Sequence, residues 1–262
     1  MNPSKVIEKL RNGETAIGTA VHLADPAVFE MTASIGFDAI WLDLEHHAHS
    51  VAQTQEFIRA VRAGGPTDVV ARPGKGEFMR MARLLEAGAH GIMYPRCESP
   101  EEAAEVVRWS KFAPLGQRGF DGANADSDYM ALPMADYLRR ANANTFVIVQ
   151  VEDERSIARC EELIRVEGVD MLMLGPADLS VLMERPGQFD HPTIVNAQRR
   201  VAAVAKSAGK HWASTSTSID HARQLIQMGA GLIFHGADIV FVRRGMSSMR
   251  EALAQIVSEA SA

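Results

Sequence analysis

The sequence predicts an α/β protein built as a (β/α)8 (TIM-type) barrel, with residues 1–262 forming one domain. Short apolar runs bounded by turn residues alternate with amphipathic segments along the chain, which is typical of buried parallel strands and the helices that cover them. Eight such alternations are present, and no Ser/Gly-rich linker interrupts them. The length of 262 residues suits one barrel of this kind, and a hydrophobic content of 47% is ample for its core.

The expected elements follow this alternation in order. The strands are expected near residues 16–21, 39–42, 69–71, 91–93, 146–151, 171–174, 210–213 and 231–235. The helices are expected near residues 26–34, 51–63, 77–87, 100–110, 156–166, 196–208 and 219–228. Glycines close several of these helices just before the next strand, as glycines at helix C-termini do.

Two stretches depart from the simple alternation. Residues 238–242 have strand propensity, but they follow the eighth strand directly, so we expect them to begin a last helix. Residues 112–145 are long and show little periodicity. They predict an extended loop over the mouth of the barrel with a short helix near residues 134–141, and loops of this length are usually functional or mobile.

Composition excludes several classes of function. A net charge of −6 without a basic stripe disfavours a nucleic-acid partner. No apolar run approaches the length needed to cross a membrane, and the N-terminus lacks the hydrophobic region of a signal peptide. Cys97 and Cys160 have no metal-like spacing and indicate reduced thiols in a cytoplasmic protein. Cys97 follows a strand, yet no base lies beside it to support a nucleophile.

Two acidic residues stand where apolar strands give way to turns. Glu152 follows the strand at residues 146–151, and Asp178 follows the strand at residues 171–174. In parallel α/β folds the functional residues lie beyond the carboxyl ends of the strands, because the loops converge there. Two carboxylates at this end suggest a divalent metal held by oxygen ligands. The alternative is that each is merely an acid in the first turn of a helix.

The end of the second strand carries two acids followed by a histidine. If strand geometry persists there, Asp43 and Glu45 share one face. A carboxylate beside the imidazole of His46 would fix its tautomer and raise its basicity, which is the setting for general acid–base work. A lone histidine in a loop would more simply cap backbone groups. His47 and His49 are expected at the solvated rim.

The third strand end and the turn after the sixth strand offer groups that bind anions. Arg72 follows an apolar strand, and its planar guanidinium suits a carboxylate or a developing enolate oxygen. An ordinary salt bridge between helices is the alternative. Residues 175–180 turn into a helix, so the backbone amides of Ala177 and Asp178 would be free to bind an anion.

Five segments taken in order resemble the HpcH/HpaI aldolase family. They are DLEH at residues 43–46, VARP at 70–73, QRG at 117–119, QVE at 150–152 and GPADLS at 175–180. The resemblance implies a metal-dependent (class II) aldolase on a (β/α)8 barrel, which reversibly cleaves a 4-hydroxy-2-oxo acid into pyruvate and an aldehyde through a metal-stabilised enolate. It also implies a homo-oligomer, a hexamer built from trimers, with the last helix exchanged between neighbouring subunits.

The resemblance also assigns roles to residues. Glu152 and Asp178 would be the ligands of Mg²⁺, Mn²⁺ or Co²⁺. Arg72 would bind the 2-oxo acid and its enolate, and His46, supported by Asp43, would move protons.

The remaining roles concern the surroundings of the metal and the substrate carboxylate. Glu45 would orient water or the metal without itself being a metal ligand. The substrate carboxylate would meet the turn formed by Gly175, Pro176, Ala177 and Asp178.

The sequence departs from the family in residues 120–126, which read FDGANAD, and in residues 211–217, which read HWASTST. We interpret both as parts of a polar, hydroxyl-rich mouth. Such a mouth would fit a sugar-derived 2-oxo-3-deoxy acid or a short polar aldehyde better than a long-chain dicarboxylate.

Three other functions fit parts of the pattern. A Schiff-base aldolase needs a desolvated lysine in the mouth, where Lys75 is the one candidate and has glycines on both sides. An acyl-CoA lyase of the citrate-lyase β type needs a basic site for the adenine phosphates, and no such cluster is evident. A non-catalytic barrel could use its thirteen methionines at interfaces, but it would have no use for paired acids beside Arg72 and His46.

Overall fold

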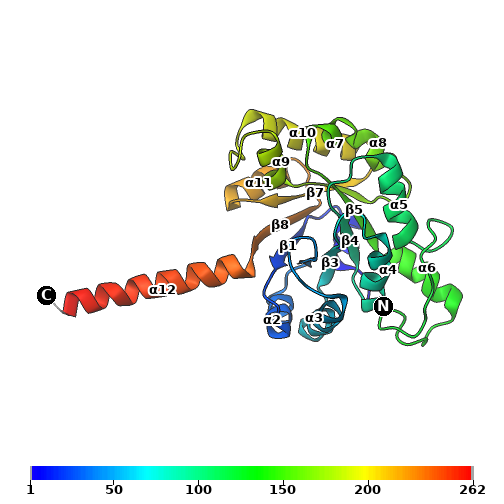
Figure 1. Ribbon diagram of the computed structural model, residues 1–262, viewed down its shortest axis with the longest axis horizontal. Coiled ribbons are helices and arrows are strands. Elements are labelled where there is room, and N and C mark those ends of the chain that lie inside the picture. The colour runs from blue at the N-terminus through cyan, green and yellow to red at the C-terminus, as the bar shows by residue number, and fades with distance from the viewer. Residues whose placement is uncertain (1, 261–262) are drawn as a thin grey trace.

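A closed barrel of eight parallel strands forms the centre of the computed structural model, which describes residues 2–260 (Figure 1). The strand order follows the sequence, and the last strand pairs with the first. The predicted (β/α)8 fold is therefore confirmed. The strands are β1 (Ala16–Val21), β2 (Ala39–Asp43), β3 (Asp68–Arg72), β4 (Gly91–Tyr94), β5 (Phe146–Val151), β6 (Met171–Leu174), β7 (His211–Ser216) and β8 (Leu232–Ala237).

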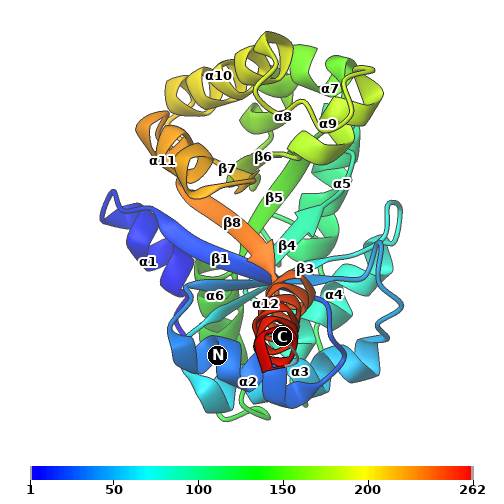
Figure 2. The same ribbon diagram turned by 90° about the vertical axis from the view of Figure 1, so that its left-hand side faces the viewer.

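Most helices surround the barrel and cover the outer face of its strands (Figures 1 and 2). Among residues 2–260, no helix combines the length and hydropathy needed to cross a membrane. The helices are α1 (Lys5–Arg11), α2 (Pro26–Ile35), α3 (Val51–Gly64), α4 (Phe78–Ala87), α5 (Pro100–Ser110), α6 (Met134–Asn144), α7 (Glu154–Ala158), α8 (Cys160–Arg165), α9 (Pro176–Leu182), α10 (Pro192–Ser207), α11 (Ile219–Gln227) and α12 (Asp238–Ala260).

Two local differences from the expected elements have clear causes. The helix expected at residues 156–166 begins earlier, because Asp153 and Ser156 form a capping box, and it divides at Arg159 into α7 and α8. Helix α1 was not expected from the sequence. Its start is fixed by the carboxylate of Asp68, which accepts hydrogen bonds from the Ser4 hydroxyl and from backbone amides of the first turn.

The alternation of side chains along the strands divides the core into two layers. One set lies inside the barrel and includes Val70, Met93, Ile148 and Phe234. The other set packs between strands and helices in a larger cluster. Since side chains alternate, residues two positions beyond an inward-facing residue also point inward, toward the carboxyl end of the barrel. Arg72 follows Val70 in this way and so points into the mouth.

The segment 112–145 does not cover the mouth, so that expectation is wrong. It connects the C-terminus of α5 to the start of β5, and both of these lie at the opposite end of the barrel from the strand C-termini. Its contacts agree, because Arg62, near the C-terminus of α3, donates to the Ala125 carbonyl, and buried Lys111 donates to Thr145 just before β5. Residues 120–126, where the sequence departs from the family, therefore lie far from the mouth of the barrel in the same chain.

Helix α12 begins at Asp238, as expected, and projects away from the barrel (Figure 1). The carboxylate of Asp238 accepts hydrogen bonds from the backbone of His22 and Leu23, which fixes the start of the helix against the loop after β1. The rest of α12 carries exposed apolar side chains, including Met246, Met249, Leu253 and Ile256.

Candidate active site

Arg72 and Asp43 form a buried ion pair at the mouth of the barrel. They are register partners at the ends of β3 and β2. The guanidinium donates from Nε to Asp43 Oδ1 at 2.8 Å and from Nη2 to Oδ2 at 2.7 Å, and it stacks on the Trp41 ring. Burial alone would raise the pKa of Asp43, but the hydrogen bonds and charge of Arg72 hold it below its usual range. Asp43 therefore orients Arg72.

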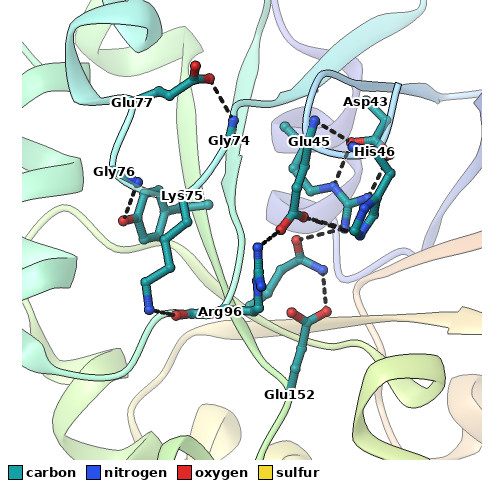
Figure 3. Close-up of polar contacts among 12 residues, drawn as sticks. Asp43, Glu45, His46, Gly74, Lys75, Gly76, Glu77, Arg96 and Glu152 are labelled. Atoms are coloured by element: carbon teal, nitrogen blue, oxygen red, sulfur yellow. Dashed lines mark hydrogen bonds and ion pairs between the residues drawn. The ribbon is translucent and has the colours of Figure 1, made fainter. Parts of the chain in front are cut away.

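Glu45 lies between two arginines beside this pair. Arg72 Nη1 lies 3.1 Å from Glu45 Oε2, and Arg96 Nη2 donates to Oε1 at 2.5 Å (Figure 3). Only 6% of the Glu45 side chain is exposed. The carboxylates of Asp43 and Glu45 therefore converge on one guanidinium, as their shared face predicted.

The ring of His46 lies nearer to Glu45 than to Asp43. His46 Nε2 is 3.8 Å from Glu45 Oε2, and 58% of the His46 side chain is exposed. Asp43 reaches His46 only at its backbone amide, with Oδ1 at 3.5 Å. The carboxylate beside the imidazole is thus Glu45, because both oxygens of Asp43 are taken up by Arg72.

Glu152 directly follows β5 and lies almost entirely inside the protein, with 2% exposed. Its Oε1 accepts a hydrogen bond from Gln150 Nε2 at 2.9 Å, whereas its Oε2 has no hydrogen-bond partner among residues 2–260. Burial, followed by repulsion from Asp178, raises the pKa of Glu152 to about 8. An ionised carboxylate at this position therefore needs a compensating cation.

Asp178 lies in the first turn of α9, half-buried, with its charge acting on Glu152. The turn approaches Glu152 closely, since a Cβ at Gly175 would lie 2.1 Å from Glu152 Oε1. No side chain caps the start of α9. The structure therefore brings Glu152, Asp178 and the turn after Gly175 into one site, as their strand-end positions predicted.

The two carboxylates suit a hard divalent cation that takes its other ligands from substrate or water. Among residues 2–260, no three His, Cys, Asp or Glu side chains form a closed metal cage. Mg²⁺ is commonly held by one or two carboxylates together with water and substrate oxygens. The unsatisfied Oε2 of Glu152 fits such a cation.

A cavity of about 280 Å³ opens beside Arg72 at the mouth. Its polar lining includes His22, His46, His47 and Thr215. A larger hollow of about 670 Å³ lies on the outer surface of α4 and α5, and Arg72 is not among the residues that line it. The smaller cavity is therefore the one that can hold a substrate against Arg72.

The polar segment 211–217 contributes to this cavity only in part, which corrects the prediction of a hydroxyl-rich mouth built from all of it. His211 begins β7 and lines a hollow at the opposite end of the barrel. Trp212 packs in the outer core layer, and the hydroxyl of Ser214 is bound to the Leu174 carbonyl. Alternation along the strand leaves Thr215 as the residue that faces the cavity.

A family model described as HpcH/HpaI aldolase/citrate lyase matches residues 17–244. The chain belongs to this family. A hydroxypyruvate/pyruvate aldolase from Sagittula stellata is 34% identical over 92% of this chain and 94% of its own length. A 4-hydroxy-2-oxo-heptane-1,7-dioate aldolase from Shigella sonnei is 30% identical over 92% and 91%. The resemblance inferred from the sequence is therefore confirmed.

A solved structure shows the same architecture. The HpcH/HpaI aldolase/citrate lyase family protein from Burkholderia cenocepacia is 32% identical, with a TM-score of 0.87 over 97% of this chain and 99% of that one. The strand-end cluster described above thus lies on the barrel of an HpcH/HpaI family member.

Three polar residues of this family member's site were not singled out from the sequence. Gln150 contacts both Arg72, at 3.4 Å, and Glu152, and its position two residues before Glu152 on one strand face could have indicated it. Arg96 reaches Glu45 across 51 residues of sequence, so no local pattern reveals it. The ring of His22 stacks on that of His47 at 4.0 Å, between two loops.

The two nucleophile candidates considered from the sequence lie away from this cluster. Cys97 is buried, and burial, followed by the charge of Glu102, raises its pKa to about 12, which disfavours the thiolate that a nucleophile needs. The ammonium of Lys75 is held by Glu98 at 2.6 Å and by the Arg96 carbonyl at 2.8 Å. Lys75 is not among the residues lining the cavity beside Arg72.

Proposed function

We propose that this protein is a metal-dependent pyruvate aldolase, a carbon–carbon lyase that reversibly cleaves a 4-hydroxy-2-oxo acid into pyruvate and an aldehyde. The proposal rests on one observation above all. A buried, oriented guanidinium stands beside a buried carboxylate with an unsatisfied oxygen, at the strand ends of an HpcH/HpaI barrel. Relatives named hydroxypyruvate/pyruvate aldolase and 4-hydroxy-2-oxo-heptane-1,7-dioate aldolase support the same reaction type.

Glu152 and Asp178 would hold the divalent cation, Mg²⁺, Mn²⁺ or Co²⁺. When bound, such a cation supplies Lewis-acid stabilisation of the negative charge that develops on the 2-oxo oxygen. Two features of the chain support this role. The buried Oε2 of Glu152 has no hydrogen-bond partner in the described residues, and Gly175 lets the turn of α9 approach that carboxylate.

Arg72 would bind the 2-oxo oxygen and donate hydrogen bonds to it as charge develops. Its position is fixed by Asp43 on one side, Glu45 on another and the Trp41 ring beneath it. A donor that is already oriented costs no reorganisation during the reaction, which is why such donors stabilise transition states effectively.

The substrate carboxylate would be taken by the backbone amides of Ala177 and Asp178, at the turn that Gly175 and Pro176 shape. This placement offsets the repulsion between an anionic substrate and the two acidic ligands. Helix α9 starts without a side-chain cap, which leaves these amides available.

His46 would remove the proton of the C4 hydroxyl, directly or through water, and return it in the synthetic direction. Its ring lines the cavity beside Arg72 and lies next to Glu45. Glu45 is therefore the carboxylate that we propose to orient the imidazole or its water. Asp43 supports His46 through the backbone amide and supports the reaction mainly through Arg72.

The substrate aldehyde would be short and polar, as released from a 2-oxo-3-deoxy sugar acid. The cavity is small, at about 280 Å³, and its lining offers imidazoles and the Thr215 hydroxyl for hydroxyl groups. Its one arginine, Arg72, is already paired with two carboxylates, so a distal carboxylate on a long-chain substrate would find no free cation there.

We also propose that the enzyme is a homo-oligomer, a trimer or hexamer, with α12 exchanged between subunits. The helix projects from its own barrel, toward the viewer in Figure 2. It carries a row of exposed apolar side chains. Ile17 on β1 is also 50% exposed, which leaves apolar barrel surface for a neighbour to cover. Residues 1–262 would act as one cytoplasmic domain, which the unpaired thiols of Cys97 and Cys160 support.

Pyruvate release from a panel of 2-oxo-3-deoxy sugar acids and 4-hydroxy-2-oxo dicarboxylates, with and without EDTA, tests the function. We expect release that EDTA abolishes and that Mg²⁺ or Mn²⁺ restores, highest with the sugar acids. EDTA-resistant release together with borohydride trapping of pyruvate on the protein would indicate a Schiff-base enzyme instead. Cleavage of acyl-CoA substrates alone would indicate a lyase of the citrate-lyase β type.

A further inference from the structure

Arg96 lies at the rim of the candidate active site, two residues after β4, and its side chain points toward Glu45 (Figure 3). Its guanidinium donates from Nη2 to Glu45 Oε1 at 2.5 Å. Its carbonyl accepts a hydrogen bond from Lys75 Nζ at 2.8 Å.

The backbone of Arg96 is held in an unusual conformation. Its φ is +46°, in the left-handed region that residues with a Cβ seldom adopt. The next residue, Cys97, donates from its backbone N–H to the Gln150 carbonyl at 3.0 Å, which ties the segment to β5. Strained backbone of this kind persists only where its surroundings fix it, and here it directs Arg96 toward Glu45.

Arg96 is the outermost member of a row of alternating charges. Asp43 pairs with Arg72, Arg72 pairs with Glu45, and Glu45 pairs with Arg96. The side chains of Arg72 and Glu45 are 5% and 6% exposed, whereas Arg96 is 51% exposed. The row therefore runs from the interior of the barrel to its rim and ends in solvent.

Without Arg96, a single guanidinium would have to compensate two nearly buried carboxylates. A buried charge that loses one of its partners interacts more strongly with the one that remains. Glu45 would then draw Arg72 toward itself and neutralise more of its positive charge. Both changes reduce what Arg72 can offer to a substrate oxygen.

We propose that Arg96 is a positioning residue, which holds Glu45 so that Arg72 keeps its orientation and its charge for the substrate. The inference rests on the proposed function, because it concerns the oxygen on which negative charge develops. Arg96 acts through Glu45 and Arg72 and does not itself contact the reacting atoms.

The test compares Arg96→Met and Arg96→Lys with the wild-type enzyme in metal-supplemented pyruvate release. We expect Arg96→Met to lower kcat about tenfold with KM changed less than about threefold, because the lost effect falls on the transition state. Arg96→Lys keeps the charge and should recover kcat to within about threefold of wild type. The control Arg155→Met removes an exposed cation from the same rim and should leave kcat unchanged.

A double-mutant cycle with Glu45→Gln separates positioning from a general structural effect. If Arg96 acts through Glu45, the double variant Glu45→Gln/Arg96→Met loses no more kcat than Glu45→Gln alone. Thermal unfolding verifies that each variant is folded, and Arg96→Gln replaces Arg96→Met if the latter does not fold.

The outcomes are distinct for the two proposals. A folded Arg96→Met enzyme with wild-type kcat overturns the inference and leaves the aldolase function standing. The same holds if the losses of kcat in Glu45→Gln and Arg96→Met simply add in the double variant. A wild-type enzyme that releases pyruvate from no 2-oxo acid overturns the function, and the inference falls with it.

Discussion

At the scale of single residues, most buried polar groups of the site are paired with one another. Arg72 makes four polar contacts with neighbouring side chains, and its orientation is thereby fixed. Glu152 differs from Arg72, since its Oε2 is buried without a hydrogen-bond partner in the described residues. Buried polar atoms in native proteins are rarely unsatisfied, so this oxygen marks where a cation would bind.

Replacing Arg72 by lysine should impair turnover without removing the charge. A lysine cannot reproduce the paired bonds to Asp43 or present a planar donor to the enolate oxygen. Loss of one such oriented donor typically costs about 10²-fold or more in kcat. Steady-state pyruvate release measures the effect, with Arg155→Lys as the control at the rim. Wild-type kcat in a folded Arg72→Lys enzyme would exclude Arg72 from the mechanism.

Replacing Gly175 by alanine should weaken metal binding while the fold is retained. The added Cβ would lie 2.1 Å from Glu152 Oε1, so the flexible end of that side chain must move. Disturbing the surroundings of a metal ligand commonly costs about tenfold or more in affinity. Titration of the metal-free enzyme with Mn²⁺ measures the effect.

The control for that substitution is Gly119→Ala, because no atom lies within 4 Å of a Cβ built at Gly119. Equal Mn²⁺ affinity in Gly175→Ala and wild type would show that Glu152 does not depend on this close approach.

At the scale of elements, buried carboxylates at the end of the barrel where the strands begin bind backbone and lysine groups of neighbouring elements. Asp38 accepts hydrogen bonds from Lys9 Nζ at 2.7 Å and from the Ile17 amide at 2.8 Å, and Lys5 Nζ lies 3.0 Å away. These contacts join α1 to β1. Burial alone would raise the pKa of Asp38, but the bonds from Lys9 and Ile17 and the charge of Lys5 lower it below its usual range.

Asp38→Asn should therefore destabilise the fold in a pH-dependent way. A carboxylate with a lowered pKa in the folded state contributes stability above its unfolded pKa of about 4, and loses it as the pH falls through the folded value. We expect a loss of about 1.5–3 kcal/mol in the free energy of unfolding at pH 7, which is the scale of a charged hydrogen bond.

Denaturant unfolding at pH 7 and at successively lower pH measures this difference. The gap between Asp38→Asn and wild type should narrow below the ordinary Asp pKa of about 4. A gap that stays constant to about pH 3 would assign the effect to packing instead of charge.

At the scale of the whole molecule, α12 is the helix that projects away from its own barrel (Figure 1). Met246, Met249, Leu253 and Ile256 recur at helical spacing and are all more than half exposed. An exposed apolar stripe of this length indicates a surface that a partner covers. The proposed exchange of α12 between subunits would bury it.

Leu253→Asp should therefore dissociate the oligomer, because it places a charge in the centre of that stripe. Sedimentation velocity of wild type and variant measures the assembly state. The control Ser247→Asp adds the same charge on the face of the helix that is turned away from that stripe and should leave the assembly intact. An unchanged oligomer in Leu253→Asp, or a wild-type monomer, would contradict the exchange.

The sequence predicted the barrel well because its strands are buried on both faces and therefore read as continuous apolar runs. It placed Arg72, Glu152 and Asp178 at the carboxyl ends of strands, because strand ends are visible as changes from apolar to polar residues. It misplaced residues 112–145, although a segment between a helix and the next strand must lie at the end opposite the mouth. Arg96 was missed because its contact with Glu45 joins residues 51 positions apart, which no local sequence pattern reveals.

Pyruvate release by metal-depleted enzyme, before and after addition of Mn²⁺, tests the central claim most directly when wild type and Glu152→Gln are compared. We predict that wild type is inactive after EDTA treatment and regains turnover with Mn²⁺, whereas Glu152→Gln stays folded and regains at most a small fraction. Full turnover in EDTA, or full recovery of Glu152→Gln, would contradict a mechanism in which this carboxylate holds the cation.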